Sequence, residues 1–124
     1  MRIFLANADR DERLALHFLL DHEPGMEVIG IAIRSDDLAA QIKACRPDIL
    51  LLDWSLVMKP AADFLSSLRS PVPKLTIVVL YIHSGMKQVV ENAGADVFVS
   101  KDTPPDGLLR TLRKMRKDEL ANLH

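Results

Sequence analysis

The apolar residues of this chain gather in five short runs, separated by longer segments in which apolar and polar residues alternate with helical spacing. The third run is the clearest, because four large apolar residues stand together directly before Asp53. Such a run is typical of a strand that is buried on both faces, as in the centre of a parallel sheet. The five predicted strands cover residues 3–6, 28–33, 49–53, 75–82 and 97–99.

A helix is predicted after each strand. Asp9, followed three residues later by Glu12, has the form of a capping box, so the first helix begins there. Its buried stripe is predicted to consist of Leu14, Ala15, Phe18 and Leu19. The second helix begins with residues 35–37 as its cap, the fourth ends at Gly94, and residues 103–106 open the last one. The alternation of strand and helix predicts a three-layer α/β sandwich with right-handed crossovers.

Composition limits the class of protein. With 124 residues, 48% of them hydrophobic and 27% charged, the chain has the size and composition of one globular domain. A formal net charge of -1 gives no general attraction to nucleic acid or to acidic membranes. The single cysteine cannot form an internal disulfide, and no apolar run is long enough to span a bilayer. We therefore expect a cytoplasmic domain over residues 1–124, without direct contact to nucleic acid or membrane.

Polar residues follow several of the predicted strands. Asn7, Asp53, Tyr81 and Lys101 stand at four carboxyl ends, and in a parallel sheet these ends share the edge where ligands bind. An aspartate that faces a lysine there fits a site for an anionic group such as phosphate. It fits a structural ion pair equally well, and the residues alone leave both interpretations open.

Several enzyme classes lack their motifs. No glycine-rich turn follows the first strand, no Gly-x-Ser-x-Gly elbow exists, and the four histidines show no metal-ligand spacing. An aspartyl phosphatase would place a second carboxylate two residues after Asp53, where Ser55 stands. A small phosphate-handling α/β enzyme is therefore the weakest alternative, and we expect a protein that is not an enzyme.

Three segments together, residues 27–30, 47–53 and 94–102, resemble the receiver domain of bacterial two-component response regulators. The likeness is greatest to receivers that precede LuxR-type helix-turn-helix output domains, and it covers essentially the whole chain. It implies a flavodoxin-like sheet of order 2-1-3-4-5 and a single receiver domain over residues 1–124, with no output domain in this chain. It also implies that Asp53 is the phosphoacceptor, that Lys101 contacts the phosphoryl group, and that Phe98 is the switch aromatic. The implied partner is a sensor histidine kinase or another signalling protein.

The family's metal site is degenerate in this chain. Two adjacent acidic residues after the first strand hold Mg²⁺ in the family, and here these positions are Asn7 and Ala8. Because Mg²⁺ prefers charged oxygen ligands, we expect weak Mg²⁺ binding, through Asp53 if at all. Asp9 is the candidate substitute carboxylate, although its spacing to Glu12 favours a role as helix cap.

Further departures surround the same site. Tyr81 replaces the family's Thr or Ser switch residue, and Ile82 fills the normally small position that admits the phosphoryl donor. Val57 and Ala61 replace a usual proline and a usual glycine in the loop after Asp53. We therefore predict an atypical receiver with impaired Mg²⁺-dependent phosphorylation, acting through protein–protein contacts. The alternative is a fully working phosphoacceptor domain that regulates transcription.

The last helix is rich in basic residues. One interpretation is a solvated face that complements the negative helix end. The resemblance favours a surface for a homodimer or another partner, formed by the last two helices and the last strand. The residues of this predicted surface are Met86, Lys87, Val90, Arg110, Arg113 and Lys114.

Overall fold

The computed structural model describes residues 1–82, 84–101 and 105–121. One parallel sheet contains the strands β1 (Arg2–Ala6), β2 (Glu27–Ala32), β3 (Ile49–Asp53), β4 (Thr76–Tyr81) and β5 (Val97–Ser100). The helices are α1 (Arg10–Asp21), α2 (Leu38–Cys45), α3 (Ala61–Arg69), α4 (Lys87–Asn92) and α5 (Pro105–Ala121). The strand order is β2-β1-β3-β4-β5. The predicted strands and the flavodoxin-like order are therefore confirmed, with strand ends shifted by no more than one residue.

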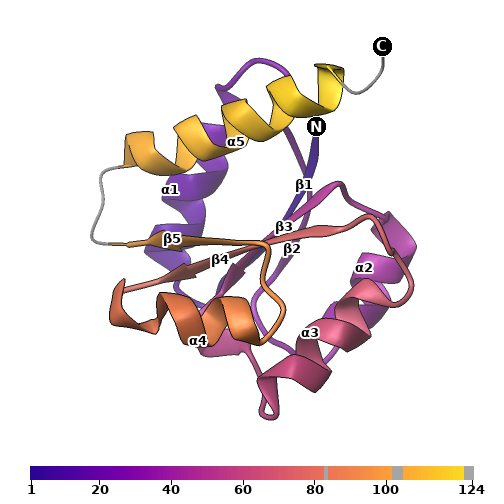
Figure 1. Cartoon of the computed structure of the whole chain (residues 1–124). Coiled ribbons are helices and arrows are strands. Elements are labelled where there is room, and N and C mark those ends of the chain that lie inside the picture. Colours follow the sequence, from indigo (N-terminus) through magenta and orange to yellow (C-terminus); the bar gives the residue numbers. More distant parts are fainter. Residues whose placement is uncertain (83, 102–104, 122–124) are drawn as a thin grey trace.

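The helices form two layers around the sheet, with α1 and α5 on one face and α2, α3 and α4 on the other (Figure 1). Neighbouring residues of β3 alternate between these layers. Leu50 and Leu52 pack on the side of α2 and α3, whereas Ile49 and Leu51 pack on the side of α5. The uninterrupted apolar run before Asp53 exists because both faces of this central strand are covered.

The buried face of α1 differs from the prediction. Leu20 is fully buried, and Leu16 and Leu19 pack against the same core. Leu14, Ala15 and Phe18, which were predicted to be buried, are exposed, Leu14 at 52% and Phe18 at 64%. Of the predicted stripe, only Leu19 faces the core. The helix carries two apolar stripes, so hydrophobic spacing alone could not decide which one faces the sheet.

The ends of two helices agree with the prediction in position. α2 begins after Asp37, although the Asp37 side chain makes no capping hydrogen bond, so the predicted cap is wrong in that respect. It ends at Arg46, which adopts a left-handed conformation with φ of 49°. Gly94 follows α4 with φ of 113°, as expected of a residue that ends a helix. Asp102 and the predicted helix start at Thr103 lie outside the described residues.

Two arginines join α5 to the turn between α1 and β2. The Nε and Nη2 atoms of Arg113 donate to the two carboxylate oxygens of Glu23 at 2.6 and 2.8 Å. Arg116 Nη1 donates to the carbonyl oxygen of Pro24 at 2.6 Å. The hydrogen bond from Arg113 lowers the pKa of Glu23, despite some desolvation, with help from the positive charges of both arginines. The segments that these bonds join are about ninety residues apart in sequence.

The predicted dimer surface is wrong at one position. Val90 is fully buried in the core between α4 and the sheet, so it cannot belong to a surface. Met86 is half-buried against the same core, while Lys87, Arg110 and Lys114 are exposed. None of the helices in the described part of the chain has the length and apolar character that a bilayer crossing needs.

Gly30 marks a close approach between β2 and β1. The pairing of these strands shifts register there, and a Cβ atom at Gly30 would lie 2.5 Å from Cε2 of Phe4. The Phe4 ring is itself buried and cannot move without repacking the core. We therefore expect Gly30→Ala to lower the free energy of unfolding by about 2 kcal/mol, measured by urea denaturation. Gly85→Ala is the control, because within the described part of the chain no heavy atom beyond its own chain neighbours lies within 4 Å of its Cβ position. An equal loss in both variants would contradict the expected clash with Phe4.

Candidate functional site

Asp53 ends the central strand and points into a protected site. Its residue is only 4% exposed. Oδ1 accepts a hydrogen bond from the backbone N–H of Ser55 at 2.8 Å, and Oδ2 accepts one from Nζ of Lys101. Lys101 is placed by its own backbone, since its N–H donates to the carbonyl oxygen of Tyr81 at 2.8 Å. The predicted meeting of Asp53 and Lys101 at one sheet edge is therefore confirmed.

Lys101 has a second carboxylate partner. Oε2 of Glu12, in the first turn of α1, lies 3.0 Å from Nζ of Lys101. Burial by itself lowers the pKa of Lys101, but the hydrogen bonds and charges of Asp53 and Glu12 outweigh it. The net effect raises the pKa of Lys101 above its ordinary 10.5. The lysine is thus held as an ammonium between two carboxylates.

Asn7 holds Glu12 in this position. Asn7 is completely buried, and its Nδ2 donates to Oε1 of Glu12 at 2.8 Å. Its Oδ1 accepts from the backbone N–H of Asp9 at 2.9 Å. The carbonyl oxygen of Asn7 accepts from Nη1 of Arg13 at 3.0 Å. The amide of Asn7 is therefore engaged at both ends, once as donor and once as acceptor.

Glu12 is the site residue that the sequence interpretation missed. The capping box assigned its side chain to the backbone N–H of Asp9, but Asn7 takes that N–H instead. Only half of the predicted box is present, since Oδ1 of Asp9 does accept from the N–H of Glu12 at 3.1 Å. The spacing of Asp9 and Glu12 also fits a helix cap with a free glutamate. The sequence contained one sign of this arrangement. Asn7 can accept a hydrogen bond from the backbone N–H of Asp9, and Glu12 is then free to turn toward Lys101.

The residues present do not fit Mg²⁺. Ala8 has no side-chain oxygen, and Oδ1 of Asn7 is already an acceptor for a backbone N–H. Oδ2 of Asp53 is held by an ammonium, which repels a second cation. Across residues 1–82, 84–101 and 105–121, no group of three His, Cys, Asp or Glu side chains is arranged to hold a metal ion.

The remaining predicted positions lie in or next to β4, β5 and α1. Tyr81 is half-buried at the end of β4, and its ring centroid lies 6.4 Å from that of Trp54. Ile82 follows it and is exposed. Phe98 is half-buried against the core on the side of α2, α3 and α4. Asp9 is exposed and serves as the N-cap of α1.

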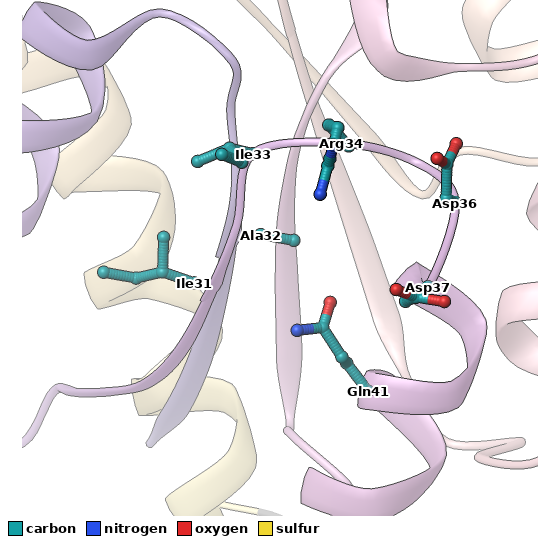
Figure 2. Close-up of a pocket in the computed structure, with 7 residues that line it drawn as sticks. All are labelled: Ile31, Ala32, Ile33, Arg34, Asp36, Asp37 and Gln41. Carbon is teal, nitrogen blue, oxygen red and sulfur yellow. The ribbon is translucent and has the colours of Figure 1, made fainter.

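A hollow of about 290 Å³ lies at the end of β2, beside the start of α2 (Figure 2). The side chains of Ile31 and Ile33 point to one side of the strand there, and Ala32 and Arg34 point to the other. Its wall consists of Ile31, Ala32, Ile33, Arg34, Asp36, Asp37 and Gln41. This wall contains neither Asp53 nor Lys101, so the hollow is distinct from the cluster of carboxylates and lysine.

Comparison with known proteins gives the class. No family model matches the chain. It is 28% identical over 116 residues to YhcZ, an uncharacterised transcriptional regulatory protein of Bacillus subtilis, covering 90% of this chain and 53% of the relative. It is 30% identical over 106 residues to NarP, the nitrate/nitrite response regulator protein of Escherichia coli. This match covers 82% of this chain and 48% of NarP. A LuxR-family two-component response regulator from Aurantimonas has the same fold, with a TM-score of 0.81 at 22% identity. The match covers 92% of this chain and 83% of that regulator's chain.

The strand order, and the likeness to response regulators over 81–82% of this chain, define the chain as a response-regulator receiver domain. A LuxR-family response regulator and the receiver domain of a NarL regulator, at 22% and 20% identity, share its fold. The chain spans between 53% and 60% of the length of four of the curated relatives that it matches.

Proposed function

We propose that this domain is an atypical receiver, in which Asp53 is a poor acceptor for Mg²⁺-dependent phosphorylation and signalling proceeds through protein–protein contacts. The observation that carries the proposal is the sharing of Lys101 between Asp53 and Glu12. In this proposal Asp53 and Lys101 keep the positions of phosphoacceptor and phosphoryl contact, and Tyr81 and Phe98 those of the switch residues.

The chemistry of phosphoryl transfer supports this view. The acceptor oxygen attacks phosphorus, while nearby cations neutralise the charge on the phosphoryl oxygens. Here both oxygens of Asp53 already accept hydrogen bonds. The carboxylate of Glu12 also reduces the attraction that Lys101 exerts on an anionic phosphoryl donor.

The proposed partners are those expected of a receiver domain. A sensor histidine kinase or another signalling protein is the proposed input, and the exposed Lys87, Arg110 and Lys114 belong to the proposed surface for a second copy or another partner. Arg113 contributes less to such a surface, because Glu23 of the same molecule already binds its guanidinium. Direct binding of nucleic acid by this domain is not part of the proposal.

The second candidate function is a working phosphoacceptor that controls transcription. It is favoured by the direct contact between Asp53 and Lys101 and by relatives that are transcriptional regulators. Asp9 would then have to supply the missing cation ligand within this domain. The two functions therefore differ in what Mg²⁺ does to the isolated domain.

Trp54 adjoins Asp53 and serves as the probe that separates them. We expect its fluorescence to show no saturable change across millimolar Mg²⁺, and acetyl phosphate to leave Asp53 unmodified by mass spectrometry. The matched control is Asn7→Asp/Ala8→Asp, which restores both acidic positions and should gain a saturable Mg²⁺ response. Saturable Mg²⁺ binding by the natural sequence, with phosphorylation that disappears in Asp53→Asn, would refute the atypical function.

A further inference from the structure

Glu12 occupies an unusual place for a residue in the first turn of a helix. Its side chain leaves α1 toward the carboxyl edge of the sheet and is 28% exposed. One carboxylate oxygen accepts from Asn7 Nδ2, and the other pairs with Lys101 Nζ. The contact therefore links α1 to the ends of β3 and β5, through the ammonium that also binds Asp53.

We propose that Glu12 is an internal anion that occupies Lys101, so that a phosphoryl group or its analogue on Asp53 must displace it. The inference rests on the proposed function in one respect, because it takes Asp53 and Lys101 as the phosphoryl site. It goes further by naming the residue that regulates access to that site.

The charge and the contacts of Lys101 explain the competition. An ammonium has three N–H donors and no acceptor, and an ionised carboxylate only accepts. Lys101 gives one donor direction to Asp53 and another to Glu12. A phosphoryl group on Asp53 would bring further anionic oxygens to the same ammonium. Glu12 opposes the phosphoryl group in two ways. It holds the ammonium of Lys101, and its carboxylate repels the negative charge of the phosphoryl oxygens.

Asn7 has a positive role in this arrangement. A carboxylate at this position would face the carboxylate of Glu12 and repel it. The amide instead donates to Glu12 at 2.8 Å and completes its hydrogen bonding. The first turn of α1 adds to the effect, because the amino end of a helix favours negative charge. The amide of Asn7 therefore supports the contact between Glu12 and Lys101.

Beryllofluoride, a phosphoryl analogue that binds aspartate, tests the proposal when Trp54 fluorescence reports its binding. The natural sequence, Glu12→Gln and Glu12→Ala are compared, each with and without Mg²⁺. We expect both variants to bind beryllofluoride about tenfold more tightly than the natural sequence, which corresponds to about 1.4 kcal/mol. Glu12→Gln keeps an acceptor for Asn7 and removes only the charge, whereas Glu12→Ala also removes the side chain that contacts Lys101.

Asp11→Asn is the matched control, because Asp11 is an exposed carboxylate in the same helical turn. It should change the affinity by less than about twofold, since an exposed charge is screened by solvent. Circular dichroism establishes that each variant is folded. Equal affinities for the natural sequence and both Glu12 variants, or no binding by any of them, would overturn the proposal.

The same measurements separate this inference from the proposed function. Tight, Mg²⁺-dependent binding by the natural sequence would refute the atypical function. The ratio of the beryllofluoride affinity of the Glu12 variants to that of the natural sequence would still decide the role of Glu12. Weak and equal binding in all variants would leave the atypical function standing and reject Glu12 as its cause.

Discussion

Lys101→Met is expected to lower the free energy of unfolding by about 3 kcal/mol. The substitution leaves Asp53, whose side chain is 5% exposed, beside the carboxylate of Glu12 with no cation between them. Removing one partner of a buried ion pair typically costs 3–5 kcal/mol, and the lower end applies because Lys101 is itself 24% exposed. Chemical denaturation at neutral pH measures the loss, and the double variant Lys101→Met/Asp53→Asn should recover most of it.

The dependence of this loss on pH follows from the raised pKa of Lys101. A group whose pKa is higher in the folded state stabilises the fold below its unfolded pKa. That stabilisation disappears as the pH rises through the folded value. On the alkaline side, the difference in stability between the natural sequence and Lys101→Met should therefore narrow above about pH 10.5. Lys87→Met is the control, since Lys87 is an exposed lysine 3.9 Å from Glu91, and it should change stability by less than about 0.5 kcal/mol.

Leu20→Ala and Leu14→Ala are expected to differ strongly, although both remove the same atoms from the same helix. Leu20 is fully buried, so its truncation should cost about 3 kcal/mol through lost burial and a cavity. Leu14 is 52% exposed, and its truncation should cost less than about 0.5 kcal/mol. Urea denaturation of the two variants decides which face of α1 is buried. A larger loss for Leu14→Ala would mean that the helix is rotated relative to the structure.

Much of the fold could be predicted from the sequence because its strands are apolar on both faces. The run before Asp53 has no polar residue to confuse its assignment. Pro47 marks the end of the helix before it, and Gly94 marks the end of the fourth helix. The orientation of α1 could not be predicted in the same way. Phe18 and Leu20 are both apolar, and only the packing against the sheet and α5 determines which of them is buried.

The candidate site could be predicted in part. Asp53 and Lys101 end parallel strands, so the topology alone brings them to one edge. Glu12 lies on a helix, where its direction depends on a hydrogen bond from Asn7 that no spacing rule reveals. The partial capping box gave this side chain a plausible local role and concealed its contact with Lys101. A long-range contact of this kind becomes apparent only when the elements are placed in space.

The two arginine contacts between α5 and the turn after α1 have a consequence for the synthesis of this domain. Until Arg113 and Arg116 leave the ribosome, α1 alone covers the face of the sheet that contains Leu5 and Leu51, and the part of that face that α5 covers stays open. A nascent chain therefore displays this apolar surface throughout translation of the strands, a situation that favours aggregation or chaperone binding. Completion of α5 covers it and joins the start of the domain to its last helix. The final helix thus sets the moment at which the newly made chain becomes a stable domain.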